Sequence, residues 1–305
     1  MPSANPAFNN PAFQDRRAVR TYPGGADAAS IGGQTQSTAF PQQAQSTAVN
    51  AHLEGQFAAP AAGALETDRM SVEDTVLKTL ALFAVLVVTA VIGWVWSAST
   101  MTVDNPAPNV IPWIVGMAGG FILAMIVSFS KKVRPALIFG YAAFEGLFVG
   151  GISLFFETIW PGIVLQATLG TLAVVGVTLA LFASGKIRAS KRATKIWMIA
   201  MIGYLVFSLI NVGMMMFGAF PAGSGGPFGM LSSIKIAGIP LGLIIGVLVV
   251  IMAAYSLVQD FDFIQQGVRN RAPRRYGWLG GFGIMVTVVW LYIEILRIIA
   301  IARSN

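Results

Sequence analysis

Seven apolar runs, each about the length of a membrane-spanning helix, constrain the fold of this chain more than any other feature. A helix of about 20 residues crosses the ~30 Å hydrocarbon core of a bilayer. Only 11% of the 305 residues are charged and 55% are hydrophobic, whereas soluble domains carry about 25% charged residues. We therefore predict an all-α integral membrane protein with seven transmembrane helices. The runs are Leu77–Trp96, Val110–Phe129, Pro135–Phe156, Pro161–Ala183, Ile196–Phe217, Ile236–Val258 and Leu279–Ile301.

The composition argues against most kinds of enzyme. The chain has no cysteine, and its one histidine, His52, lies in a polar segment. Zinc sites, haem sites and Ser–His or Cys–His catalytic pairs need residues that are missing here. We expect no cofactor and no enzymatic activity. An embedded acid pair could form a protease-like dyad, but the sequence offers no substrate cleft.

Basic residues are concentrated in alternate loops, which predicts the orientation in the membrane. The other loops carry Asp104, Glu157 and a Gly/Pro/Ser-rich stretch with only Lys235 near its end. Because basic loops stay in the cytoplasm, we predict a cytoplasmic N-terminus and an outside C-terminus. The net charge of +7 is thus a topology signal, and we expect the lipid bilayer, not nucleic acid, as the partner. The basic residues are Lys131, Lys132 and Arg134; Lys186, Arg188, Lys191, Arg192 and Lys195; and Arg269, Arg271, Arg274 and Arg275.

The chain divides into a polar tail and a membrane domain. Residues 1–70 are rich in Ala, Gly, Gln, Ser and Pro, and such a segment cannot bury enough apolar surface to fold, so we predict disorder. A short Asn-Pro-Ala-Phe repeat begins at Asn5 and again at Asn10. It could dock on a partner or on the membrane, or have no role. The seven-helix domain is 71–305, and its first helix is predicted to begin after an N-cap at Ser71.

Four acids fall inside or at the edge of the apolar runs, where a carboxylate costs several kcal/mol and is usually functional. Asp260 and Asp262 close the sixth run, Glu145 lies eleven residues after Arg134, and Glu294 lies inside the seventh. Asp260 and Asp262 could also simply end a helix among the lipid headgroups. Glu294 could instead form an ion pair with Arg297, three residues later on the same side of the helix.

Glycines at four-residue spacing predict a helix-packing face in the sixth span. They are Gly238, Gly242 and Gly246. Small residues at this spacing allow two helix backbones to approach closely. We read them as packing residues and not as a binding site.

Three motifs carry a resemblance to the Bax inhibitor-1 family, also called the transmembrane Bax inhibitor motif family. They are Phe144-Glu145-Gly146-Leu147, the segment from Gln259 to Ile264 (QDFDFI), and Leu291-Tyr292-Ile293-Glu294. The resemblance covers about 71–303, and the long tail is similar to that of actinobacterial members. It implies a pH-sensitive calcium leak in which an aspartate ending span six and an acid in span seven share a proton. Asp260 matches the first acid, and Glu294 stands where an aspartate is expected.

The spacing between these two acids departs from the family pattern. Thirty-four positions separate Asp260 from Glu294. If Asp260 lies at the inner mouth and span seven starts near Leu279, Glu294 is about 22 Å into the membrane. Either 268–281 is an interfacial segment and the helix starts after Gly283, or Glu294 pairs with Glu145 and leaves Asp260 or Asp262 as a separate ring.

The expected function is a passive cation leak across the bacterial cytoplasmic membrane, gated by protonation of buried carboxylates. A calcium ion could lie near Asp260 or Glu294. The alternatives are a proton-coupled transporter of a small solute, which could use the same acids as a relay, and a non-conducting regulator that binds other membrane proteins. Protein partners cannot be named from the sequence.

Overall fold

The structure, a computed structural model, describes residues 68–218 and 228–304. It confirms an all-α membrane protein, because seven helices are long and apolar enough to cross a membrane. Most of the tail for which we predicted disorder lies outside the described residues. The spans are α3 (Val72–Ala98), α4 (Ile111–Phe129), α5 (Pro135–Ile159), α6 (Ile163–Ala183), α7 (Lys191–Met216), α9 (Leu241–Arg269) and α10 (Tyr276–Ser304).

The first span begins where the capping signal predicts. The Ser71 side chain accepts a hydrogen bond from the backbone N–H of Asp74 at 3.1 Å, which satisfies one of the free amides of the first turn. One face of α3 is buried: Asp74 and Thr75, Lys78 and Thr79, then Leu82 and Leu86. The spacing of three to four residues is that of a helix with one side against the bundle.

The sixth span differs from its prediction at both ends. A short helix α8 (Met230–Ser233) and a hairpin of β1 (Lys235–Ile236) and β2 (Ile239–Pro240) precede α9. Gly238 lies in the hairpin turn with φ of 83°, a conformation that glycine adopts without strain. It is therefore not on the packing face, and the prediction for Gly238 is wrong.

The other end of α9 runs well past the two aspartates. The helix continues nine residues beyond Asp260, to Arg269. The alternative that Asp260 and Asp262 end a helix among the headgroups is therefore wrong. A length of 29 residues corresponds to about 43 Å of helix, so α9 projects beyond the bilayer core.

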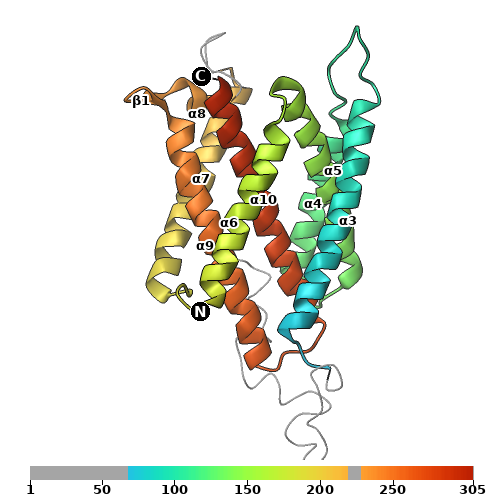
Figure 1. The fold of residues 1–305 in the computed structure, drawn as a ribbon, viewed down its shortest axis with the longest axis vertical. Coiled ribbons are helices and arrows are strands. Elements are labelled where there is room, and N and C mark those ends of the chain that lie inside the picture. The colour runs from blue at the N-terminus through green and yellow to red at the C-terminus, as the bar shows by residue number, and fades with distance from the viewer. Residues whose placement is uncertain (1–67, 219–227, 305) are drawn as a thin grey trace, which may run out of the picture.

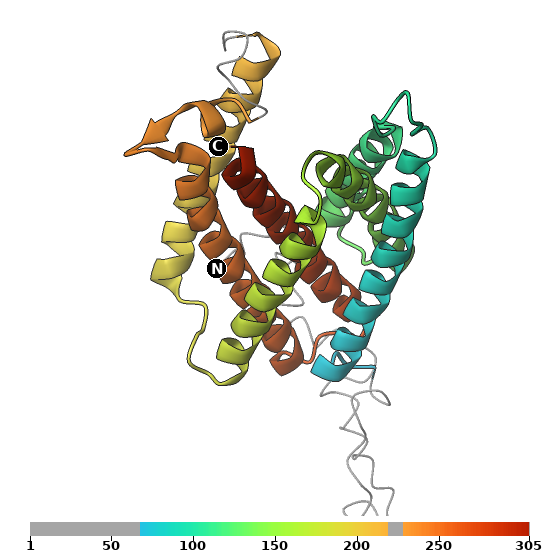
Figure 2. The same ribbon diagram turned by 45° about the horizontal axis from the view of Figure 1, so that its top comes forward.

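Helix α10 is the centre of the bundle (Figure 1). It crosses between α3 with α5 on one side and α9 with α6 on the other, and packs on all four of them. One apolar core surrounds its first half and includes Leu82, Ile264, Phe282 and Met285. A second surrounds the other half. Figure 2 shows α7 at the edge of the molecule, and Asn211 is the one residue of this helix that is fully buried.

Glycines set the closest helix contacts. A Cβ at Gly146 would overlap Thr89, and one at Gly150 would overlap the carbonyl oxygen of Ala90, so α3 and α5 touch through their backbones. In α9, a Cβ at Gly242 or Gly246 would overlap side chains of the last turns of α10. Gly242 and Gly246 thus lie at the α9–α10 interface.

We expect Gly150→Val to destabilise the bundle by about 1–3 kcal/mol or more, because overpacking a tight contact forces the helices apart. Thermal unfolding in detergent measures the change. Gly176→Val in α6 is the matched control, since nothing lies within 4 Å of a Cβ there. Equal melting temperatures for the two variants would contradict this account of the α3–α5 contact.

The three basic loops lie at the same end of the bundle. The α4–α5, α6–α7 and α9–α10 connections are at the bottom of Figure 1, opposite the C-terminus. We call this the inner end. The strict alternation of loops required by the positive-inside rule is therefore consistent with the observed path of the chain.

Labelling of single cysteines tests the orientation, because the chain has no cysteine of its own. Asp104→Cys lies on an exposed loop at one end and Lys186→Cys on an exposed loop at the other. In intact cells an impermeant thiol reagent should label position 104 and not position 186. Labelling at 186 without permeabilisation would reverse the predicted orientation.

Candidate functional site

Asp260 is buried between α9 and α10. Its residue is 2% exposed, and its carboxylate accepts a hydrogen bond from the Thr287 hydroxyl at 2.6 Å. Nine residues separate it from the end of α9 at Arg269, or about 13 Å along the axis. Asp260 is therefore buried within the bundle, about two and a half helical turns before α9 ends.

Glu294 is also buried, but it has charged and polar partners. The Arg297 guanidinium forms an ion pair with it, and the Tyr204 hydroxyl of α7 donates to its second oxygen at 3.1 Å. Arg297 also donates to Tyr204 at 2.9 Å. The local ion pair that the spacing allowed is what the structure shows.

The structure does not bring Asp260 and Glu294 together. Thr287, the partner of Asp260, precedes Glu294 by seven residues on α10, which is two turns or about 10 Å of helix. Asp260 accepts its hydrogen bond from Thr287, whereas Glu294 is bonded to Tyr204 and Arg297. In this conformation the two carboxyl groups do not share a proton.

Glu145 and Asp262 lie apart from both. Glu145 is half-buried on α5, and Tyr141, one turn earlier, is its hydrogen-bonding neighbour. Gly120 of α4 faces it, where a Cβ would lie 3.0 Å from the carboxylate. Asp262 accepts from the Gln266 amide at 2.9 Å, one turn along α9. Glu145 does not contact Glu294. The pairing of these two acids, which the sequence left open, is therefore not present in the structure.

The other alternative, an interfacial segment at 268–281 with the membrane helix starting after Gly283, is wrong as well. Helix α10 begins before these glycines. It is a continuous helix from Tyr276 to Ser304 and includes Gly280, Gly281 and Gly283. A Cβ at Gly280 would lie 2.9 Å from Ile264, and one at Gly281 would lie 2.9 Å from Thr79. The glycines let α10 approach α9 and α3, and they do not break the helix.

A charged cluster at the inner end was not predicted as a site. Lys78 binds the Asp74 carboxylate at 2.5 Å, and Arg274 of the α9–α10 loop binds its other oxygen at 2.8 Å. Lys78 also donates to the Arg274 carbonyl at 2.7 Å and lies 5.5 Å from the Trp278 ring centroid. The hydrogen bond that Arg274 donates to the Asp74 carboxylate raises the pKa of the Arg274 guanidinium. A lysine four residues after Asp74, inside an apolar run, was the signal available in the sequence.

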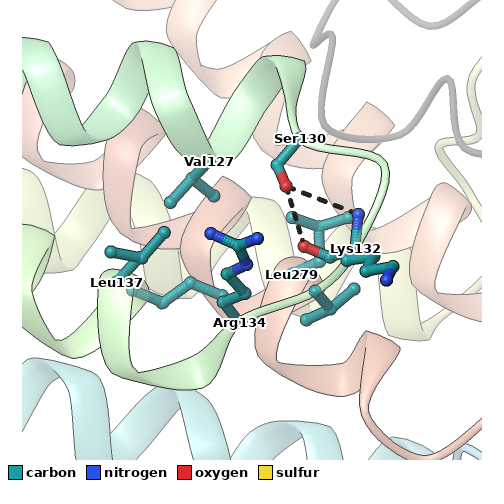
Figure 3. Close-up of a pocket in the computed structure, with 8 residues that line it drawn as sticks. Val127, Ser130, Lys132, Arg134, Leu137 and Leu279 are labelled. Carbon is teal, nitrogen blue, oxygen red and sulfur yellow. Dashed lines mark hydrogen bonds between the residues drawn. The ribbon is translucent and has the colours of Figure 1, made fainter.

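A shallow hollow also lies at the inner end, between the α4–α5 loop and α10 (Figure 3). Val127, Leu137 and Leu279 line its apolar side, and the Ser130 hydroxyl donates to the Lys132 carbonyl at 3.0 Å. Its cavity volume is ≈ 10 Å³, about the lower limit for one water molecule. It is too small to admit a hydrated cation.

No cluster of three or more His, Cys, Asp or Glu side chains that could hold a metal occurs within residues 68–218 and 228–304. Calcium prefers six to eight oxygen ligands, often from several carboxylates. Asp260 and Glu294 stand apart, so they do not supply ligands to one common ion in this structure.

The family model described as Bax inhibitor 1 like matches residues 5–304. The match takes in all seven spans and also most of the tail, so it is wider than the 71–303 on which the sequence motifs rest. No curated protein and no solved structure matches the chain.

We expect Arg297→Gln to lower stability by about 3–5 kcal/mol, because removing one partner leaves the buried Glu294 charge uncompensated. Thermal unfolding in detergent measures this loss. The double variant Glu294→Gln/Arg297→Gln should recover most of it, since two amides can hydrogen-bond without a charge. A single variant as stable as wild type would mean that the pair is solvated.

Proposed function

Because this chain belongs to the Bax inhibitor 1 like family, we propose that it forms a passive, pH-sensitive leak for cations, calcium among them. The proposed location is the bacterial cytoplasmic membrane, with the N-terminus in the cytoplasm. The single observation that carries the proposal is the environment of Asp260, described next.

Asp260 is a buried acid with one neutral partner. The Thr287 hydroxyl is its hydrogen-bond donor, and no Lys or Arg pairs with it in the part of the chain that the structure describes. Burying an ionised carboxylate without a cation is very unfavourable. The closed bundle therefore favours the protonated, neutral acid at this position.

The route from Asp260 toward the inner end is closed by apolar side chains. Ile264, one turn further along α9, is 5% exposed and belongs to the core that includes Phe282 and Met285. Hydrophobic constrictions of this kind stop ions by excluding water. Cations can pass only if α9 and α10 separate enough for water to enter.

Loss of the Asp260 proton favours the separation of α9 from α10. An ionised carboxylate gains hydration when the interface opens, and it then attracts cations into the wetted route. Gln259 adds to this effect, because its amide nitrogen is buried without a hydrogen-bond partner among the described residues. An unpartnered buried donor costs about 1–3 kcal/mol, and water would satisfy it.

Glu294 has a different part in this proposal from the one that the motifs imply. Its charge is balanced by Arg297, so a change of pH near neutrality does not leave it bare. We assign it to the joint between α10 and α7, where Tyr204 bonds both members of the pair. The proton that gates the leak is assigned to Asp260 alone.

Calcium flux into proteoliposomes tests the proposal. Protonation stabilises the closed state, so flux should be low in acid and rise with pH across roughly pH 6–8. Asp260→Asn keeps the shape of the side chain but has no proton to lose, and should flatten this dependence. Asp262→Asn, two residues away and half-buried, is the matched control and should keep the wild-type profile.

Other outcomes point to other functions. Flux that requires a gradient of protons and a solute would indicate a coupled transporter, and no flux at any pH would favour a non-conducting regulator. If Asp260→Asn keeps the wild-type pH profile, Asp260 is not the gate. Glu145→Gln is then the variant to measure, because Glu145 too has only a hydroxyl neighbour.

A further inference from the structure

We propose that Asp74, Lys78 and Arg274 form a charge clasp that holds the inner end of the leak closed. This inference rests on the proposed function and adds a second element to it, beyond the end of α9, which lies nine residues after Asp260. The three residues come from the start of α3 and from the α9–α10 loop.

The clasp joins two segments that are far apart in the sequence. Arg274 reaches Asp74 through two hydrogen bonds, from Nε at 3.1 Å and from Nη2 at 2.8 Å. Lys78 closes the cluster by binding Asp74 and the Arg274 carbonyl. Asp74 is thus held from its own helix and from the loop at the same time.

Backbone pairing next to the clasp fixes the same loop. The Met70 N–H donates to the Ala272 carbonyl at 2.7 Å, and the Arg274 N–H donates to the Asp68 carbonyl at 2.9 Å. Met70 and Ala272 are 2% and 1% exposed. The residues that lead into α3 therefore lie antiparallel to the loop and cover it.

Burial shows that the cluster is more than a helix cap. The side chains of Asp74 and Lys78 are 8% and 10% exposed, whereas Glu73 beside them is exposed. A cap needs only the Ser71 hydroxyl and the backbone N–H of position 74, which are already paired. A buried lysine on a membrane helix needs a further reason.

Contacts of α10 connect the clasp to the Asp260 interface. A Cβ at Gly277 would lie 3.0 Å from Thr75 and 3.3 Å from the Lys78 ammonium, so the first turn of α10 rests on the clasp. One turn later, Gly280 packs on Ile264 of α9. Ile264 is the residue that must move for water to reach Asp260, so the clasp resists the same separation.

The charges at this junction balance. Lys78 and Arg274 carry two positive charges, and Asp74 together with Asp68, which lies near Arg274, carries two negative ones. Asp74 is the acid that binds both basic groups, so loss of its charge weakens the contact between α3 and the loop.

Neutralising Asp74 in the full-length protein tests the clasp. We expect Asp74→Asn to raise calcium flux into proteoliposomes at least severalfold at acidic pH, where the wild type is closed. Glu73→Gln removes the same charge one residue away on the exposed side, and should leave flux unchanged. Equal flux in the two variants, with the pH profile of the wild type intact, would overturn the clasp and leave the Asp260 gate standing.

A disulfide supplies a second test, because it locks the junction instead of loosening it. Met70 and Ala272 adjoin the antiparallel bridge of Arg69 and Pro273 and share a backbone hydrogen bond. Cα atoms of such a pair are about 5.5 Å apart, which a disulfide between Met70→Cys and Ala272→Cys can span. Oxidation should lower flux at alkaline pH, and a reductant should restore it. A cross-linked protein that conducts as fast as the reduced one would refute the clasp.

The two tests together separate the clasp from the proposed function. A wild-type protein that carries no calcium at any pH overturns both. A protein that conducts, loses its pH dependence in Asp260→Asn, and ignores both the disulfide and Asp74→Asn has the Asp260 gate without the clasp.

Discussion

A buried acid needs another group to replace the water it has lost, and this requirement divides the acids of the bundle into two kinds. Asp74 and Glu294 each form an ion pair with a basic side chain. Among the described residues, the hydrogen-bond partners of Asp260 and Glu145 are hydroxyl groups. The first kind links segments of the chain through charged partners. An acid of the second kind can gain or lose a proton without leaving a basic side chain unpaired. For this reason the proposed gate is an acid of the second kind.

The spans and the start of α3 could be predicted because their signals are local. An apolar run of about 20 residues predicts a membrane helix, and Ser71 caps the first turn of α3. The far end of α9 could not be predicted in the same way. Two aspartates are typical of a helix end, but α9 continues to Arg269 and Asp260 is buried beside Thr287 of α10. The prediction for Gly238 was wrong for a related reason. A four-residue spacing of glycines does not show whether the first of them lies in the helix or in the turn before it.

The acids themselves were conspicuous in the sequence, and their partners were not. Thr287 and Tyr204 are ordinary residues for a membrane helix, and only the rotation of each helix shows which acid they reach. Arg274 was read as one more basic loop residue, a role that the positive-inside rule explains without any contact. Pairings between helices depend on tertiary packing, so the motifs located the acids but gave the wrong relation between Asp260 and Glu294.

The contact between Asp74 and Arg274 spans 200 positions, and this has a consequence for how the protein is made. Chains are synthesised and begin to fold from the N-terminus. The first span therefore enters the bilayer with Asp74 and Lys78 paired only to each other. The loop that brings Arg274 to Asp74 emerges just before the last helix. Assembly of the inner end is then the final step of biogenesis, and a chain that stops before residue 274 lacks the contact that ties its first helix to the last.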